Sequence, residues 1–459
     1  MLREGRCAMK IVTCYKASIR GQLTADGKTV RVSDALMKAT ADTCRAALAF
    51  CVDAFLAKWE ELLPLKGVFR KKRGENFIHS TARVTAAFPA FDARFPYMPS
   101  GMRRAIVADA LGMVSSYQSN LRNWEASDPA ARGAKPVIGI PDRYELTFYY
   151  REKDVSALDA GVIRLKLFDG RAWAWYGFRL DPSEARYIAR LSEHRRMLSP
   201  TVEKTHRAYR IRFAFEEKRS LVPDGHPLRC RVLACDLGIN AAASWCVMTS
   251  DGTVHARGVI HAPAEEDRLK HLTSRVRMYQ QAGKRSRCVF RWLNAANRAL
   301  SIATAKAIMD IAELYSVDCL VFEHLDLSGR KRGGRKMRLH LWRARDIQAR
   351  VETMAHRDGM RLSRICAWNT SRLAFDGSGR VKRGRESGRT GGHYSLCEFP
   401  SGKLYNCDLN AAQNIGARFF LREYAKRKDG PPLPGTPYRT LSHLLMVRAY
   451  YDNQATSAA

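Results

Sequence analysis

The chain has 459 residues, too many for one ordinary hydrophobic core, so we expect two to four domains. Its composition, 46% hydrophobic and 27% charged, argues against a disordered protein, and no apolar run is long enough to cross a bilayer. The 78 Lys and Arg against 45 Asp and Glu give a net charge of +33, which predicts a polyanionic partner. Because the basic residues are spread along the whole chain, a folded nucleic-acid-binding surface fits better than a ribosomal or chromatin-like protein with basic tails.

The start of the chain predicts a strand followed by a helical domain. MKIVTCYKASIRG at 9–21 alternates in part as a strand does, and the turn signal DGK follows it. Ser33 is the predicted N-cap of a helix whose apolar residues recur at helical spacing as far as Trp59. We therefore assign 1–30 to the first part of a β-domain and 31–135 to a helical domain.

Two further segments complete the predicted helical domain. VFRKKRGENF at 68–77 is rich in cations and is predicted as a basic loop. Residues 101–125 predict a second helix with one apolar stripe. Arg103 and Arg104 fall outside that stripe, so we expect both on the surface as candidate nucleic-acid contacts.

Strand-like segments rich in aromatic and β-branched residues come next, at 143–152, 161–170, 171–180 and 206–217. Together with the N-terminal strand they predict a small β-barrel or bent sheet. We assign 136–228 to the second part of this β-domain, so the helical domain is inserted between its two parts. Arginines among Tyr, Phe and Trp favour contacts with a sugar-phosphate backbone and stacked bases. The candidates on these strands are Arg151, Arg164, Arg207 and Arg210. The alternative is a purely structural barrel.

From residue 229 buried strands alternate with helices, as in an α/β core. Asp236 ends one apolar strand, Glu323 ends another, and Asp408 opens a late helix. Such acids are rare unless they are paired or bind a cation. Three carboxylates together would repel one another, and Mg²⁺, which prefers oxygen ligands, removes that conflict. Two ions about 3.5–4 Å apart can catalyse phosphodiester hydrolysis.

Each acid taken alone has a plain structural reading: a turn for Asp236, a strand end for Glu323 and an N-cap for Asp408. Their order along the chain is the arrangement of an RNase H-like core. The surrounding residues sharpen this interpretation. DLGIN at 236–240, VFEHLD at 321–326 and DLNAAQNIGAR at 408–418 closely resemble the three RuvC motifs of transposon-encoded TnpB nucleases and of related compact type V CRISPR effectors.

Two more segments add to this resemblance. NTSR at 369–372 resembles the segment before that family's zinc element, and MPSGMRRAIVADALGMVSSYQSNLRNW resembles its helical recognition region. The resemblance implies a multidomain α+β protein with an RNase H-like (RuvC) nuclease core at 229–365 and 408–428. It also implies an N-terminal wedge barrel and an inserted helical recognition domain.

The implied function is RNA-guided cleavage of double-stranded target DNA in one RuvC site. Asp236, Glu323 and Asp408 would hold Mg²⁺, with two ions, and the partners would be a guide RNA, from a transposon or a CRISPR array, and the DNA. Two alternatives remain open. One is a guided DNA-binding protein whose cleavage is weak or dispensable, and the other is an unguided RuvC-type transposase or resolvase. We expect no membrane partner and a place in the prokaryotic cytoplasm, on the nucleoid when DNA is bound.

The segment 366–407 departs from the family pattern of two CxxC pairs. The first pair would fall near Ala374 and Gly377, and the second keeps Cys397 but has Pro400 or Ser401 at its partner position. A closed zinc site needs four ligands, and the remaining candidates, Cys366, His393, Cys397 and Cys407, are irregularly spaced. We therefore predict a degenerate zinc-finger-like segment without zinc, and mostly buried, reduced thiols among the twelve cysteines.

Two Gly- and Arg-rich stretches, 327–338 and 376–392, are predicted as mobile loops that guide single-stranded DNA. The first carries the candidate contacts Arg330, Lys331, Arg332 and Arg335. The alternative is that both are solvated linkers. No element is predicted for the tail, 429–459.

Overall fold

The computed structural model describes residues 8–129, 132–141, 146–147, 154–156, 158–205, 208–221, 227–238, 242–325, 343–427 and 439–457. The chain divides into two compact units. One is Val12–Glu217, and the other combines Met1–Ile11 with Lys218–Ala459. None of the described helices is both long enough and apolar enough to span a membrane.

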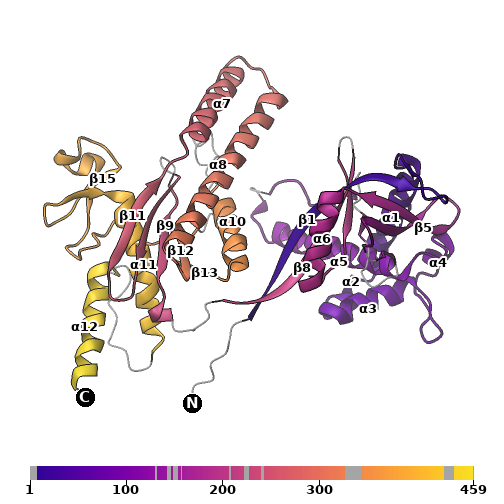
Figure 1. Cartoon of the computed structure of the whole chain (residues 1–459), viewed down its shortest axis with the longest axis horizontal. Helices are drawn as coiled ribbons and strands as arrows, with labels where there is room; N and C mark the ends of the chain where they lie inside the picture. Colours follow the sequence, from indigo (N-terminus) through magenta and orange to yellow (C-terminus); the bar gives the residue numbers. More distant parts are fainter. Residues whose placement is uncertain are drawn as a thin grey trace. The chain divides into compact units, whose positions relative to one another are not determined.

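The unit Val12–Glu217 is built on a sheet that curls into a half-barrel, with the strand order β3-β7-β8-β1-β5-β4 (Figure 1). The N-terminal strand therefore belongs to this sheet, as predicted. β2 pairs with β1, and β6 pairs with β8. The strands are β1 Ala8–Leu23, β2 Thr29–Val30, β3 Leu146–Thr147, β4 Val162–Phe168, β5 Trp173–Leu180, β6 Arg196–Met197, β7 Thr201–Lys204 and β8 Tyr209–Ser220.

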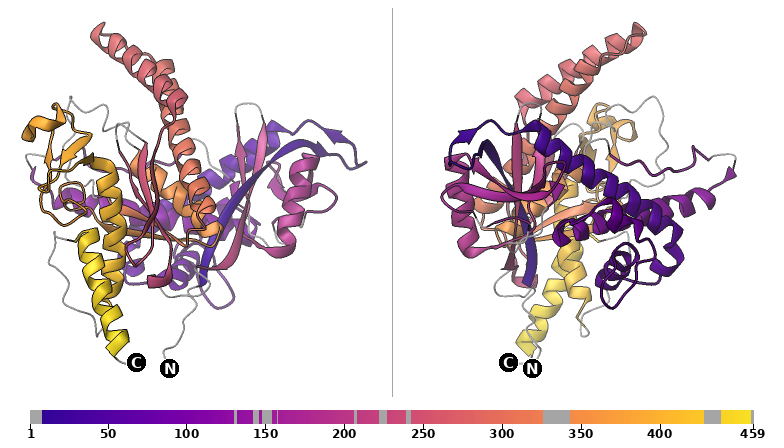
Figure 2. Two further views of the ribbon diagram at one scale, coloured as in Figure 1. Left: turned by 60° about the vertical axis from the view of Figure 1, so that its left-hand side comes forward. Right: turned by 90° about the vertical axis from the view of Figure 1, so that its right-hand side faces the viewer.

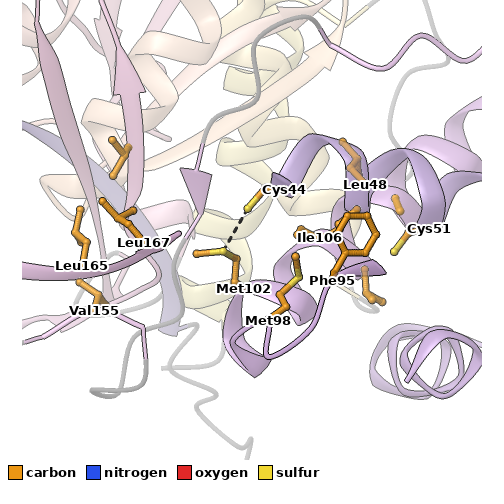
Figure 3. Close-up of a cluster of buried hydrophobic side chains, with 14 of the residues drawn as sticks. Cys44, Leu48, Cys51, Phe95, Met98, Met102, Ile106, Val155, Leu165 and Leu167 are labelled. Carbon is orange, nitrogen blue, oxygen red and sulfur yellow. Dashed lines mark hydrogen bonds between the residues drawn. The ribbon is translucent and has the colours of Figure 1, made fainter. Parts of the chain in front are cut away.

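Helices pack on this sheet and share one core with it. They are α1 Asp34–Ala57, α2 Trp59–Leu62, α3 Gly67–Ile78, α4 Ala90–Arg94, α5 Ser100–Glu125 and α6 Pro182–His194. Ser33 caps α1 as predicted, because its hydroxyl accepts a hydrogen bond from the Leu36 amide. Figure 3 shows Cys44 and Met102, from α1 and α5, beside Leu165 and Leu167 of β4, all members of one buried cluster. The helices and the sheet thus form a single hydrophobic core.

The prediction of a basic loop at 68–77 is wrong, because these residues lie in α3. Phe77 and Ile78 are buried, and Gly74 allows a close approach, since a Cβ there would lie 3.2 Å from the Phe55 ring. The guanidinium of Arg73 stacks over the Phe77 ring. Contacts with distant residues therefore stabilise a helix that its basic sequence does not indicate.

The second unit contains a five-stranded sheet of order β11-β10-β9-β12-β13 (Figure 1). β10 pairs antiparallel with both β11 and β9, whereas β12 pairs parallel with both β9 and β13. The strands are β9 Val232–Asp236, β10 Ala243–Met248, β11 Val254–Ile260, β12 Cys319–His324 and β13 Arg361–Cys366. The short helix η2 Pro227–Arg229 precedes the sheet.

Helices cover both faces of this sheet. α11 (Cys407–Ala425) and α12 (Leu441–Ser457) share one apolar cluster with Val232 and Ala234 of β9. α8 (Arg287–Leu314) and α10 (Ala344–Arg357) share a second apolar cluster with Leu233 and Cys235, the alternate residues of β9. The alternation of side chains along each strand therefore decides which residues face α11. α7 (Pro263–Gln281) forms a hairpin with α8 that extends beyond the sheet (Figure 2).

Two C-terminal predictions need correction. The stretch 376–392 is not an irregular loop, because it contains β14 (Lys382–Arg383) and two 3₁₀ turns, Gly384–Glu386 and Gly388–Thr390. β14 forms a small sheet with β15 (Leu396–Glu398) and β16 (Leu404–Asn406). The tail contains α12, whose Tyr451 stacks on Tyr424 of α11 with ring centroids 5.1 Å apart.

Candidate active site

Two of the predicted acids lie side by side on neighbouring parallel strands. Cys235 of β9 is opposite Phe322 of β12, so Asp236 and Glu323, the next residues, continue the same register. Val232 and Ala234 precede Asp236 on its side of β9, and both face α11. Cys319 and Val321 place Glu323 on the same side of β12. Both carboxylates therefore project from one face at the ends of their strands.

The third acid is in the first turn of α11, which lies on that face. Asn406 is the N-cap, and its side-chain oxygen accepts hydrogen bonds from the amides of Asp408 (2.9 Å) and Leu409 (3.0 Å). The helix approaches the sheet closely, because a Cβ on Gly416 would lie 2.2 Å from the Met248 sulfur. The positive end of a helix dipole favours a carboxylate in the first turn.

A polar stripe on α11 holds the chain that follows β13. The Asn410 amide donates to the Leu373 carbonyl (2.8 Å), and the Asn414 amide donates to the carbonyls of Thr370 and Leu373 (2.8 Å each). One turn further on, Arg418 donates to the carbonyls of Cys366 (3.0 Å) and Trp368 (2.6 Å). The residues of the third motif beyond Asp408 therefore position the 366–373 segment.

That segment in turn contacts Glu323. The hydroxyl of Thr370, which is 3% exposed, donates a hydrogen bond to a Glu323 carboxylate oxygen. The side chain of Gln348, from α10, donates to the Glu323 backbone carbonyl at 3.0 Å. Thr370 lies in the NTSR segment, so the resemblance indicated the segment, but the contact between Thr370 and Glu323 could not be read from the sequence.

Burial raises the pKa values of all three acids, and repulsion from the other two adds to the shift of Asp236. Burial raises the pKa of Asp236 well above its usual value, and repulsion from Glu323 and from Asp408 adds to this effect. Burial also raises the pKa of Glu323, opposed by the Thr370 hydrogen bond and by Arg418. The pKa of Asp408 is raised by burial and opposed by Arg383. The structure therefore brings all three carboxylates within electrostatic reach of one another.

One cation that sequence reasoning missed lies among these acids. The charge of Arg383, in β14, lowers the pKa values of both Asp236 and Asp408. Its buried Nε has no hydrogen-bond partner among the described residues, while its Nη2 donates to the Tyr394 carbonyl at 3.1 Å. No motif marks Arg383, because it lies in the Gly- and Arg-rich stretch among similar residues.

The donor set fits Mg²⁺ in its chemistry, since it consists of carboxylate oxygens that repel one another when ionised. Within the described parts of the chain, no three His, Cys, Asp or Glu side chains are gathered as a complete ligand set. Of the four candidate zinc ligands, Cys397 and Cys407 lie together, with their thiols in hydrogen-bonding contact. Both are buried in an apolar cluster with Val381 and Phe399. The predicted absence of zinc stays a prediction.

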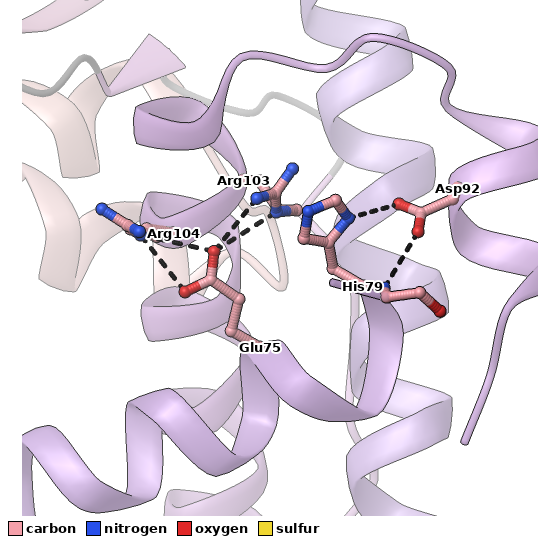
Figure 4. Close-up of polar contacts among 6 residues, drawn as sticks. Glu75, His79, Asp92, Arg103 and Arg104 are labelled. Atoms are coloured by element: carbon pink, nitrogen blue, oxygen red, sulfur yellow. Dashed lines mark hydrogen bonds and ion pairs between the residues drawn. The ribbon is translucent and has the colours of Figure 1, made fainter. Parts of the chain in front are cut away.

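The predicted arginine contacts have different outcomes. Arg103 was expected on the surface, but it is 8% exposed, and its guanidinium pairs with Glu75 at 3.2 Å (Figure 4). Arg104 is exposed and pairs with the same carboxylate at 3.2 Å. Arg164 and Arg210 are exposed on β4 and β8, and their contact with nucleic acid stays a prediction. The remaining candidates lie outside the described residues: Arg151, Arg207, Arg330, Lys331, Arg332 and Arg335.

The cysteines follow the prediction for the described residues. Eight are buried and none forms a disulfide there, while Cys14, Cys288 and Cys366 are exposed. Burial raises the pKa of the Cys44 thiol to about 12, so this group stays protonated.

This arrangement of sheet, helices and half-barrel occurs in known proteins. The fold is that of compact type V CRISPR effectors, which confirms the motif resemblance at the level of fold. The chain is similar to Cas12f1 in the Cas12f1-sgRNA-target DNA complex, with a TM-score of 0.57 and 10% identity over 88% of this chain and 98% of that one. It is also similar to the mini-RNA-guided endonuclease CRISPR-Cas_phi3, with a TM-score of 0.51 and 10% identity over 92% and 94% of the two chains.

Sequence comparisons reach less far. A family model described as the Aq_aa04 family matches residues 24–169, which lie in the half-barrel unit. No curated protein matches the chain. At 10% identity the structural likeness establishes the fold, and the chemistry has to be argued from the chain's own residues.

Proposed function

We propose that this protein is an RNA-guided endonuclease that cleaves target DNA by metal-dependent phosphodiester hydrolysis in a single RuvC site. One observation carries the proposal: Asp236, Glu323 and Asp408 come to one end of one sheet face, where the charges of Glu323 and Asp408 both raise the pKa of Asp236. Carboxylates that destabilise one another in the free protein are expected at sites built for cations.

The sheet supports the RuvC assignment. Three antiparallel strands followed by two parallel ones, with the first acid on β9 and the second on the adjacent β12, is the arrangement expected of an RNase H-like core. The third acid then comes from a helix packed on the same face. The three motifs that resemble RuvC therefore occupy the elements that such a core requires.

The chain's own residues have separable roles in this proposal. The three acids would bind two Mg²⁺ ions, which when bound supply an activated water and stabilise the leaving oxygen. Thr370 orients Glu323, and Asn410 and Asn414 hold the segment that carries Thr370. Arg383 provides positive charge beside Asp236 and Asp408, where a scissile phosphate would bind.

Two observations support a guide RNA as partner: the positive charge of the chain and its likeness to a protein solved in complex with RNA and DNA. A net charge of +33 suits a protein bound to long polyanions, and the Cas12f1 structure to which the chain is similar contains sgRNA and target DNA. Sequence specificity would come from pairing between guide and target, and the protein would read backbone shape and a short flanking motif.

The test is the RNA dependence of cleavage. Protein purified from cells that also express its flanking genomic region should co-elute with a discrete RNA, which is sequenced to design a matching plasmid. We expect cleavage of that plasmid in Mg²⁺, and none in EDTA, after ribonuclease treatment, or with a mismatched plasmid. Cleavage at full rate by RNA-free protein would replace the proposal with an unguided nuclease. Guided binding without cleavage would replace it with a DNA-binding function.

A further inference from the structure

A cavity of about 140 Å³ lies beside the end of β13, on the face of the sheet that α11 covers. Ile365, 4% exposed, forms part of its apolar lining, and Trp368 contributes an indole that is 61% exposed. An aromatic ring this open to solvent, beside an apolar floor, is suited to stack on a flat ligand.

Positive charge surrounds the cavity. Four arginines line it: Arg364, Arg418, Arg422 and Arg439. Two carboxylates pair with them, since Arg364 contacts Glu352 at 2.7 Å and Arg422 contacts Glu423 at 2.9 Å. Glu423 is shared with Lys426, also at 2.9 Å. The described lining therefore combines four arginines with an exposed aromatic ring and contains no carboxylate, which suits a nucleotide.

Residues that line the cavity are neighbours of residues in the candidate active site. Ile365 is opposite Glu323 in the pairing of β13 with β12. Arg418 lines the cavity and donates hydrogen bonds to the carbonyls of Cys366 and Trp368. Trp368 is two residues before Thr370, which donates to Glu323. A ligand in this cavity would thus lie next to the second acid.

We propose that this cavity binds one unpaired nucleotide of the DNA strand being cut, with its base stacked on Trp368 and its phosphate among the arginines. The inference rests on the proposed function and adds a binding residue to it. The DNA must be single-stranded where it reaches the acids, because the bases of a duplex are already stacked on one another and are not free to stack on Trp368. Holding one base beside Glu323 would set the position of the scissile phosphate.

A crosslinking experiment tests the occupant without relying on cleavage. The guided complex carrying Asp236→Asn, which keeps the strand uncut, is assembled with 5-iododeoxyuridine at successive positions of each DNA strand. In a second arm, 5-iodouridine is placed in the guide RNA. After irradiation, we expect one DNA position to couple to the peptide that contains Trp368. Coupling of that peptide to the RNA instead, or to neither nucleic acid, would overturn the proposal.

Variants then measure the contribution of stacking. Trp368→Ala should slow single-turnover cleavage about tenfold at unchanged target binding, and Trp368→Phe should restore most of the rate. Trp292→Ala is the matched control, because that indole is also exposed (45%) but lies on α8. Cleavage by Trp368→Ala at the parent rate would contradict the proposal. If the parent protein crosslinks to DNA at Trp368 but does not cleave it, the proposed nucleotide site stands and the proposed nuclease function fails.

Discussion

Charged side chains lie partly or fully buried in both units, but their arrangements are opposite. In the half-barrel unit, Glu75 lies between Arg103 and Arg104, with an ion pair of 3.2 Å to each (Figure 4). In the other unit, the charges of Glu323 and Asp408 both act on Asp236, and within the described residues none of the three acids forms an ion pair. The first arrangement neutralises its charge, and the second concentrates it.

This difference separates structural charge from functional charge. A buried ion pair is costly to break because the remaining partner is left uncompensated, so Glu75 is needed for the fold. A cluster of like charges lowers the stability of the free protein and is retained where a bound cation compensates for it. Substitutions at the two places should therefore have opposite effects on stability and unequal effects on cleavage.

The largest effect is expected for the acids. Asp236→Asn, Glu323→Gln and Asp408→Asn should each lower the single-turnover cleavage rate by on the order of 1000-fold, because metal binding supplies several kcal/mol to the transition state. Guided DNA binding should persist. Glu75→Gln should leave the rate unchanged and lower the free energy of unfolding by about 2 kcal/mol. Near-parent cleavage by Glu323→Gln would show that the site is misassigned.

A smaller loss is expected at Arg383. Arg383→Ala should lower the cleavage rate about 100-fold, because it removes a positive charge next to two of the acids. Arg389 is the control, since it belongs to the same basic stretch but is 57% exposed at its side chain and pairs with Glu398 at 3.2 Å. If Arg383→Ala and Arg389→Ala lower the cleavage rate equally, Arg383 contributes only to the overall positive charge of this stretch and has no specific role at the acids.

Thr370 should have an effect of about tenfold, through the position of Glu323. Thr370→Val should require more Mg²⁺ for half-maximal cleavage, and Thr370→Ser, which keeps the hydroxyl, should restore the parent Mg²⁺ dependence. Thr353→Ala serves as the control, because the exposed Thr353 hydroxyl donates to the Ala349 carbonyl of its own helix. An unchanged Mg²⁺ dependence in Thr370→Val would leave Thr370 with a purely structural role.

The pH dependence of stability should reveal the clustered acids. The folded-state pKa of Asp236 is raised, so between its unfolded value near 3.8 and its folded value the native state binds more protons. Metal-free protein should therefore lose stability as pH rises through that window. Asp236→Asn should remove this part of the loss and raise stability at neutral pH by about 1 kcal/mol. Chemical denaturation at several pH values, in EDTA, measures the difference, and parallel curves for parent and variant would contradict the repulsion.

The smallest effects compare two helical glycines. Gly416 of α11 lies against the sheet, where a Cβ would be 2.2 Å from the Met248 sulfur, and Gly112 of α5 has open space around its Cβ position. Gly416→Ala should destabilise the protein by about 1–3 kcal/mol. Gly112→Ala should stabilise it by about 0.5–1 kcal/mol through helix propensity. Thermal unfolding checks both, and stabilisation by Gly416→Ala would mean that α11 can move away from the sheet.

Several predictions from the sequence were right because local rules decide them. The N-cap of α1, the strand that ends in Asp236, the strand that carries Glu323 next to its last residue, and the helix with Asp408 in its first turn lie within one residue of where the sequence placed them. Side chains alternate between the two faces along β9 and β12, and the parallel pairing of these strands places both acids on one face of the sheet.

The failures have a common cause, which is that the deciding contact comes from residues distant in the chain. Arg103 is buried because Glu75, on another helix, neutralises it. Residues 68–77 are helical because Phe77 and Ile78 pack into a core supplied by α1 and α5, and the tail helix α12 forms against Tyr424.

The sequence by itself determined the identity of the three acids and the elements that carry them, because motif and periodicity are local properties. Only the tertiary structure decided which groups surround those acids. Thr370 comes from the 366–373 segment, Arg383 from β14 and Arg418 from α11, and tertiary packing rather than sequence spacing brings them to the acids. Electrostatic fields depend on distance in space, so charge that lies far away in the chain becomes decisive at the site.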